Sequence, residues 1–155
     1  MPESDPHLLG PGFWPTPFTA AEIREASRGG KTIRLLVEHP DDTRTERVNS
    51  FSDGDDDGAM LTQWVVGDDA PATARRVTWA ELQGHASFPR DRSERSTETI
   101  DHPLGRLACI RFDVRSHPDA APAIFWFALA FPGMPVLYET PVEGGIERTI
   151  VTSIE

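Results

Sequence analysis

The amino-acid sequence predicts an α+β domain that is mainly β: a single curved antiparallel sheet of about seven to nine strands, forming an incomplete barrel with two short helices. Two observations predict this fold class. Apolar and polar residues alternate with a period of two in segments spread over most of the chain, and short turn signals separate these segments. Strands and helices do not alternate regularly, so we expect an antiparallel meander and not a parallel βαβ sheet.

The chain has 155 residues, the length of one domain. We divide it into a Pro-rich N-terminal arm, residues 1–17, and a single antiparallel β domain, residues 18–155. Its net charge of −10 repels phosphate backbones and anionic lipids, so we expect no nucleic-acid partner and no membrane insertion. Lys31 is the only lysine beside fourteen arginines, and this composition is typical of a GC-rich bacterial genome.

The compartment is predicted from the cysteine content and the N-terminus. Cys109 is the only cysteine, which excludes an intrachain disulfide and a disulfide-rich secreted scaffold. The first twelve residues carry no basic region and no apolar run, so they do not resemble a signal peptide. We therefore expect a cytoplasmic protein.

The first structured elements are the arm and a helix. Phe13 and Trp14 are expected to pin the arm onto the domain; the alternative is that they contact a partner. Thr19 to Glu22 forms a capping box, flanked by the hydrophobic staple residues Phe18 and Ile23, and predicts a helix over 20–27. The same device at Thr78–Glu81 predicts a second, short helix that breaks near Gly84.

Strands are predicted where the period is two. Residues 43–51 are polar and predict an exposed or edge strand, whereas residues 90–99 predict a charged loop followed by a short edge strand. The other strands are predicted at 32–37, 59–66, 72–79, 105–115 and 146–154.

A run of eighteen residues without charge, 121–138, is the stretch around which the domain is expected to form. Residues 124–131 do not alternate, so both faces of this strand are expected to be covered, as in a central strand. A membrane span is the rival interpretation, but Pro132, Gly133 and Pro135 disfavour a helix. Pro132-Gly133 fits a type II turn, followed by a second strand from Val136 to about Thr140.

Candidate metal sites in the sequence are weak. The loop Asp53–Gly58 matches the first half of a calcium-binding loop, but Trp64 stands where the bidentate glutamate belongs, so we interpret it as an acidic hairpin turn. The histidines show no metal-ligand spacing, and three of them precede proline in turns; the five are His7, His39, His85, His102 and His117. We assign no metal ligand and no cofactor.

Candidate catalytic residues are equally weak. Cys109 is interpreted as a buried small hydrophobe. His85, Ser87 and Asp101-His102 contain the residue types of a hydrolytic triad, but no framing motif places the serine. Neither a dinucleotide-binding fingerprint nor a Walker loop occurs in the sequence. We assign no catalytic residue, and the ligand-binding residues are left unknown.

Three segments of the C-terminal half carry a resemblance: Gly105–Phe112, Ile124–Phe127 and Pro132–Val136. They resemble small uncharacterised bacterial β proteins and, more distantly, the periplasmic lipoprotein-carrier superfamily. The resemblance implies a curved antiparallel sheet closed by helices, with an apolar concave face that can hold lipid. It implies no catalytic residues, and this chain departs from the carriers in lacking a recognisable export signal.

We expect a non-enzymatic binding domain of unknown specificity that uses the concave face of the sheet, or an edge, to bind an apolar ligand or a protein partner. One alternative is a structural or accessory subunit of a larger assembly. Another is an enzyme whose site is assembled from turns, with His85, His102 and the acidic loop as candidates. The sequence leaves the oligomeric state open.

Overall fold

The computed structural model describes residues 5–155. Within these residues nine strands form one sheet in which every neighbouring pair is antiparallel, and two short helices accompany it. The predicted fold class is therefore confirmed. The strands are β1 (Lys31–Glu38), β2 (Arg44–Ser52), β3 (Gly58–Val65), β4 (Thr73–Thr78), β5 (Ser93–His102), β6 (Gly105–Val114), β7 (Ala123–Ala128), β8 (Leu137–Val142) and β9 (Gly145–Ile154).

The strand order is β4-β3-β2-β1-β9-β8-β7-β6-β5. Two meanders, β1 to β4 and β5 to β9, are joined by the pairing of β1 with β9, in which Leu36 lies opposite Ile150. The outermost strands β4 and β5 are not paired with each other, so the sheet is open along one side. Polar and charged side chains cover both edge strands, as expected for strands that must not pair with another chain.

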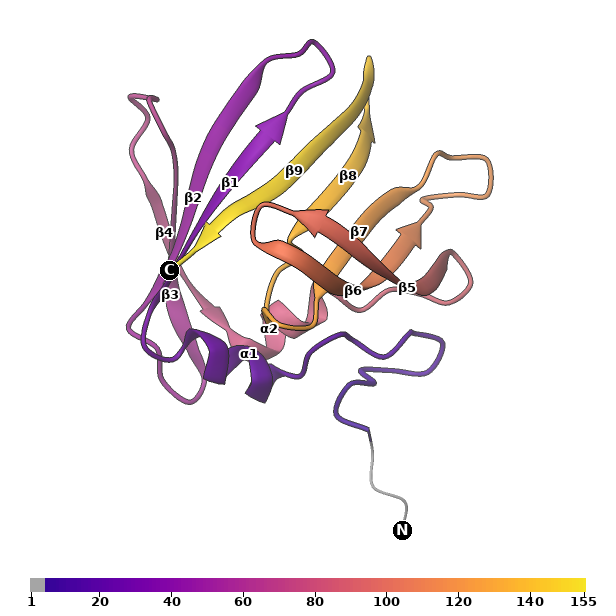
Figure 1. The fold of residues 1–155 in the computed structure, drawn as a ribbon. Coiled ribbons are helices and arrows are strands. Elements are labelled where there is room, and N and C mark those ends of the chain that lie inside the picture. Colours follow the sequence, from indigo (N-terminus) through magenta and orange to yellow (C-terminus); the bar gives the residue numbers. More distant parts are fainter. Residues whose placement is uncertain (1–4) are drawn as a thin grey trace.

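The helices lie next to each other at one end of the curled sheet (Figure 1). α1 (Ala20–Ser27) precedes β1, and α2 (Trp79–Gly84) begins where β4 ends. The chain then continues from α2 to β5, so the segment that contains α2 connects the two open edges of the sheet. α2 therefore lies on the connection between the unpaired edge strands β4 and β5, and α1 packs against α2.

Each helix begins at a predicted threonine cap. The Thr19 hydroxyl accepts from the Glu22 amide at 3.1 Å, and the Glu22 carboxylate accepts from the Thr19 amide at 2.9 Å, which completes the capping box. The Thr78 hydroxyl likewise accepts from the Glu81 amide at 3.0 Å. The second box is only half formed, because the Glu81 carboxylate binds Arg75 instead.

Three predicted strand positions differ in the structure. β2 was predicted to be exposed or at an edge; it is an interior strand between β1 and β3, partly exposed at Arg44, Glu46 and Ser52. The charged segment expected to be a loop at 90–99 is mostly strand, since β5 begins at Ser93 and pairs with β6 along its whole length. The uncharged run yields β7, an interior strand as predicted, but this strand ends at Ala128 and does not extend to Phe131.

The core consists of two clusters of buried apolar side chains. The first cluster contains Ile33, Leu35, Leu107, Cys109, Trp126, Ala128, Val136, Leu137 and Val151. The second cluster joins the helices and the arm to the sheet, and it contains Phe18, Ile23, Ala59, Trp79, Ala86, Ile110, Phe112 and Phe127. The predicted staple residues Phe18 and Ile23 both belong to the second cluster, so helix α1 is held by the packing that its cap predicts.

Both faces of β7 are covered, as predicted, but by different means. Phe125 and Phe127 contact the aromatic ring of Phe88, which follows α2. On the opposite face, Trp126 is 7% exposed and its indole N–H donates to the Glu98 carboxylate at 3.3 Å. The Arg111 guanidinium lies 5.2 Å from the centre of the same indole ring.

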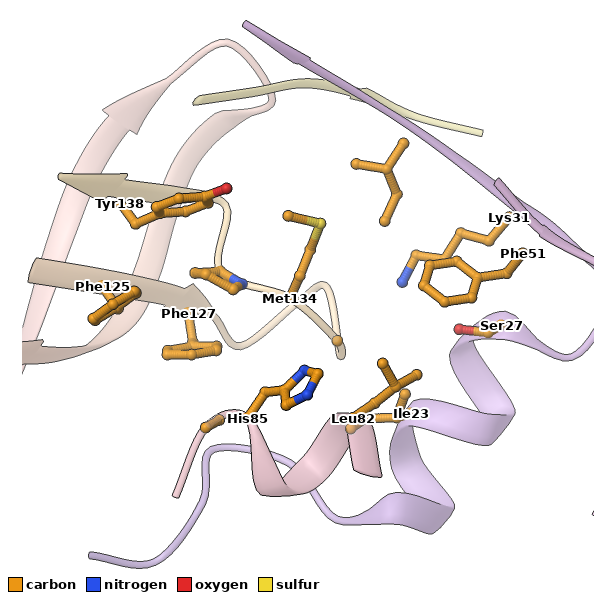
Figure 2. A pocket seen from close by; sticks show the side chains of 14 residues that line it. Ile23, Ser27, Lys31, Phe51, Leu82, His85, Phe125, Phe127, Met134 and Tyr138 are labelled. Atoms are coloured by element: carbon orange, nitrogen blue, oxygen red, sulfur yellow. The ribbon is translucent and has the colours of Figure 1, made fainter. Parts of the chain in front are cut away.

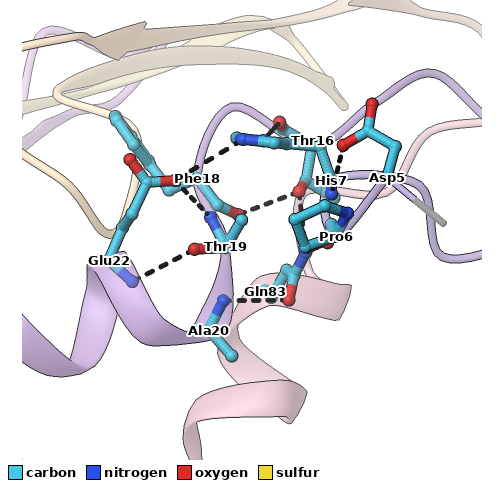
Figure 3. A network of polar contacts seen from close by, with 9 residues as sticks. All are labelled: Asp5, Pro6, His7, Thr16, Phe18, Thr19, Ala20, Glu22 and Gln83. Carbon is cyan, nitrogen blue, oxygen red and sulfur yellow. Dashed lines mark hydrogen bonds and ion pairs between the residues drawn. The ribbon is translucent and has the colours of Figure 1, made fainter. Parts of the chain in front are cut away.

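The arm is pinned onto the domain, as predicted, in the part that the structure describes; residues 1–4 of the predicted arm lie outside the described residues. The Trp14 amide donates to the Phe88 carbonyl at 2.9 Å, whereas the Phe13 side chain stays 37% exposed. Figure 3 shows the central contact: the buried side chain of Gln83 donates to the Pro6 carbonyl and the Thr16 hydroxyl and accepts from the Ala20 amide. One glutamine of α2 therefore ties the arm to both helices.

Candidate functional site

A cavity of about 260 Å³ lies between the two helices and the sheet. In Figure 2, Lys31 and Phe51 from β1 and β2 point toward Phe125, Phe127 and Tyr138 from β7 and β8, above the helices. The cavity therefore lies inside the curve of the sheet. Fourteen residues, most of them apolar, line it: Ile23, Ser27, Lys31, Ile33, Phe51, Leu82, His85, Ala86, Phe125, Phe127, Gly133, Met134, Pro135 and Tyr138.

The aromatic wall of the cavity follows from strand alternation. Phe125 and Phe127 stand two residues apart on β7 and project to the same face, while Trp126 between them projects to the other. Phe125 lies opposite Tyr138 of β8, and their rings stack with centroids 6.0 Å apart. The predicted hairpin therefore supplies one side of the cavity.

The loop between β7 and β8 supplies three lining residues of the cavity, Gly133, Met134 and Pro135. Gly133 has a φ of +138°, a value that favours glycine. The hydrogen-bonded turn after β7 lies at Leu129-Ala130, where the Phe131 amide donates to the Ala128 carbonyl at 3.1 Å, and not at Pro132-Gly133, where a type II turn was predicted. Met134 enters the cavity from this loop (Figure 2). Methionine is flexible and polarisable and adapts to ligands of different shapes. The second strand begins at Leu137, one residue later than predicted.

Lys31 is the charged group of the cavity. Its side chain reaches into the cavity from the first residue of β1 (Figure 2), yet the residue is only 8% exposed. Its ammonium donates a hydrogen bond of 2.9 Å to the Pro132 carbonyl. Burial lowers the pKa of Lys31, because removing an ammonium from water disfavours its charged form.

The other polar groups of the wall are neutral or partly exposed. Ser27 is buried at the end of α1, His85 is exposed beside α2, and Tyr138 is half-buried. None of the fourteen lining residues is an aspartate or a glutamate. The cavity can therefore hold an apolar molecule, and a polar group on that molecule could contact the Lys31 ammonium.

The residue types of a hydrolytic triad are not brought together among the described residues. Both ring nitrogens of His102 bind backbone groups. Its Nδ1 accepts from the Leu104 amide at 3.1 Å, so its Nε2 donates to the Val136 carbonyl at 2.9 Å. His85 lies at the cavity wall, and no hydrogen bond within residues 5–155 joins its ring to Ser87 or Asp101.

Cys109 is a buried core residue, as predicted. It is 2% exposed and belongs to the first apolar cluster. Burial raises the pKa of its thiol, and Glu98 adds to this shift. A thiol with a raised pKa is a poor nucleophile at neutral pH, so this cysteine acts by packing.

The acidic segment Asp53–Gly58 is the turn between β2 and β3. The Asp55 carboxylate accepts from the amides of Asp57 at 2.9 Å and Gly58 at 3.0 Å, and it also pairs with Arg76. The two amide hydrogen bonds hold the pKa of Asp55 below its usual value. Within residues 5–155, no group of three or more His, Cys, Asp or Glu side chains could hold a metal ion.

In the described part of the chain, no helix is both long and apolar enough to cross a membrane. Comparison of the chain with models of known protein families and with curated proteins gives no match.

Sequence reasoning missed Lys31, Phe51 and Met134 as cavity residues. A signal for Lys31 was present: it is the only lysine, and it stands two residues before Ile33 on the apolar face of an alternating strand. Phe51 had no such signal, because the segment around it is polar and predicted an exposed strand.

Proposed function

We propose that this protein is a non-enzymatic binding domain that holds a small apolar molecule in the cavity between its helices and the inner side of its sheet. The observation that carries the proposal is the cavity itself, which is lined mainly by apolar and aromatic side chains with a few polar groups. This composition is typical of ligand-binding pockets. A volume of about 260 Å³ corresponds to roughly nine water molecules at about 30 Å³ each. Ligands of about ten non-hydrogen atoms therefore fit it.

The distribution of exposed apolar residues favours a ligand over a protein partner. The large apolar side chains that remain exposed are scattered over the arm, the β3 end, the β7–β8 loop and the β8–β9 hairpin: Leu8, Leu9, Phe13, Trp64, Val66, Leu129, Val142 and Ile146. Single exposed residues of this kind are usual on monomers. The cavity, in contrast, gathers its apolar side chains around one volume.

The proposal places this function in the cytoplasm and excludes nucleic acid and membranes as partners. A net charge of −10 supports the exclusion, since it repels phosphate groups. The single cysteine, a buried free thiol, supports a compartment in which disulfides are not needed for stability.

Octan-1-ol, a neutral apolar molecule with nine non-hydrogen atoms, is the probe that tests this proposal. The chain has three methionines, so labelling the methionine methyl groups with ¹³C gives three signals. Met134 lines the cavity, whereas Met60 lies on β3 outside it. We expect a saturable shift of the Met134 signal, assigned with the variant Met134→Leu, and no matching shift at Met60.

A matched pair of variants tests where the probe binds. Ala86 is buried in the cavity wall, and Ala86→Leu reduces the free volume. Ala70 is exposed in the β3–β4 loop, so Ala70→Leu adds the same group outside the cavity. We expect weaker binding of octan-1-ol only for Ala86→Leu. Absence of any saturable shift at Met134 in the unaltered protein would sink the proposal.

A further inference from the structure

Lys31 is buried, and no other residue within 5–155 compensates its charge. In the part of the chain that the structure describes, its ammonium makes one hydrogen bond, to the Pro132 carbonyl, and no carboxylate lies within ion-pair distance. An ammonium has three N–H donors, so the neutral carbonyl leaves two of them available. Buried lysines are ordinarily paired, because an uncompensated charge in an apolar environment is unfavourable.

The free side of the ammonium faces the cavity. Lys31 is one of the lining residues, and in Figure 2 its side chain extends from β1 toward Met134. A Cβ atom added at Gly133 would lie 3.2 Å from Nζ, so the glycine lets the loop approach the ammonium on the side of Pro132. The loop and β1 thus fix the position of Nζ, while the cavity remains open to it.

The cavity lining is cationic through Lys31, whereas the whole protein has a net charge of −10. The chain carries 25 acidic and 15 basic side chains, yet none of the described residues that line the cavity is acidic. The other titratable side chains that line it are His85 from the α2 segment and Tyr138 from β8. An anionic group inside the cavity would therefore meet a cation and no carboxylate.

We propose that the ligand is a small monocarboxylic acid with an apolar body, whose carboxylate pairs with the Lys31 ammonium while its hydrocarbon part lies against Phe125, Phe127 and Leu82. This inference rests on the proposed function and adds the chemical class of the ligand. A single lysine matches a monoanion. A phosphate carries up to two negative charges and is usually held by several donors, whereas among the described residues that line this cavity Lys31 is the one lysine and none is an arginine.

The carboxylate supplies what the folded protein lacks. The ligand carboxylate accepts hydrogen bonds from the remaining N–H groups of Lys31 and places a negative charge beside the buried ammonium. Binding of the anion therefore favours protonated Lys31 and raises the pKa of this group above its value in the free protein. A neutral alcohol of the same length fills the cavity equally well but leaves the charge uncompensated.

The test compares octanoate, octan-1-ol and octylamine, titrated at neutral pH and followed by the Met134 methyl signal. We expect octanoate to bind at least about tenfold more tightly than octan-1-ol, the ratio given by a charge-assisted hydrogen bond, and octylamine to bind most weakly. Equal affinities for octanoate and octan-1-ol would overturn the inference while leaving the proposed function standing. No saturable shift with any of the three would overturn both.

Two further measurements assign the effect to Lys31. Lys31→Met is expected to lose the preference for octanoate but to keep octan-1-ol binding, and Arg34→Met, which removes an exposed charge from the same strand, is expected to change neither. The second measurement needs no variant: because Lys31 is the only lysine, its ¹³Cε signal is unique and reports its titration. Saturation with octanoate should raise the pKa of Lys31, and saturation with octan-1-ol should not. An unchanged titration with octanoate bound would refute the pairing, even if Lys31→Met failed to fold.

Discussion

The Lys31 ammonium and the Pro132 carbonyl are joined by a hydrogen bond of 2.9 Å across 101 residues of chain. This contact links the first residue of β1 to the loop between β7 and β8, and both segments contribute residues to the cavity wall. It therefore holds β1 and this loop together, while two N–H donors of the buried ammonium have no partner within residues 5–155. The contact has a measurable consequence even without a ligand.

The first prediction concerns the pH dependence of stability. Burial lowers the pKa of Lys31 from its usual 10.5, so between the lowered value and 10.5 the unfolded chain binds more protons than the folded one. This group therefore makes the free energy of unfolding rise with pH across that window. Lys31→Met should lack this rise, and Arg34→Met should retain it, in urea unfolding measured from neutral pH to about pH 10. Parallel pH profiles for Lys31→Met and the unaltered protein would contradict the burial of the charge.

The second prediction concerns Trp126. Trp126→Ala should lower the free energy of unfolding by about 3–5 kcal/mol, because a large buried ring would be replaced by a cavity. Trp64→Ala serves as the control, since Trp64 on β3 is 37% exposed. Urea unfolding of both variants measures the difference. Equal decreases in the free energy of unfolding for the two variants would contradict the burial of Trp126 in β7.

The third prediction concerns the helix caps. Thr19→Ala and Thr78→Ala should each lower the free energy of unfolding by roughly 1 kcal/mol, because first-turn amides lose their acceptor. The loss should be larger at Thr19, where the capping box is complete, than at Thr78, where it is half formed. Serine at either position keeps the hydroxyl and should restore most of the stability. Neutral alanine variants at both positions would show that these hydroxyls do not stabilise the helices.

The fourth prediction concerns the acidic turn. The Asp55 carboxylate already accepts two backbone amides and pairs with Arg76, so we expect no binding site for calcium there. Melting temperatures in a few millimolar calcium and in magnesium at equal ionic strength should agree. A true site would stabilise the folded protein by about 2.7 kcal/mol at roughly a hundredfold excess over Kd. A rise of several degrees with calcium alone, abolished by Asp55→Asn with Asp57→Asn, would establish the site.

Local signals predicted the architecture well. The capping residue Thr19 placed the start of α1, and the alternation of Ile33, Leu35 and Val37 placed β1, because these patterns depend on residues close in the sequence. Strand order did not follow from such patterns. The polar segment of β2 was expected to be exposed or at an edge, yet pairing with both β1 and β3 places β2 inside the sheet.

The site was harder to predict than the fold. Lys31, Phe51 and Phe127 lie far apart in the sequence, and only the curvature of the sheet brings them around one volume. No local pattern encodes that curvature. Aspartates and glutamates are plentiful in the sequence, so only the folded structure shows that no carboxylate of residues 5–155 pairs with Lys31.

Intermolecular nuclear Overhauser effects between bound octanoate and the protein would locate the ligand. The ligand methylene protons should show contacts to the methyl groups of Met134, Leu82 and Ile23 and to the ring of Phe127, all of which line the cavity. Contacts confined to exposed side chains such as Leu129 or Ile146, or no contacts at all, would contradict binding inside the sheet.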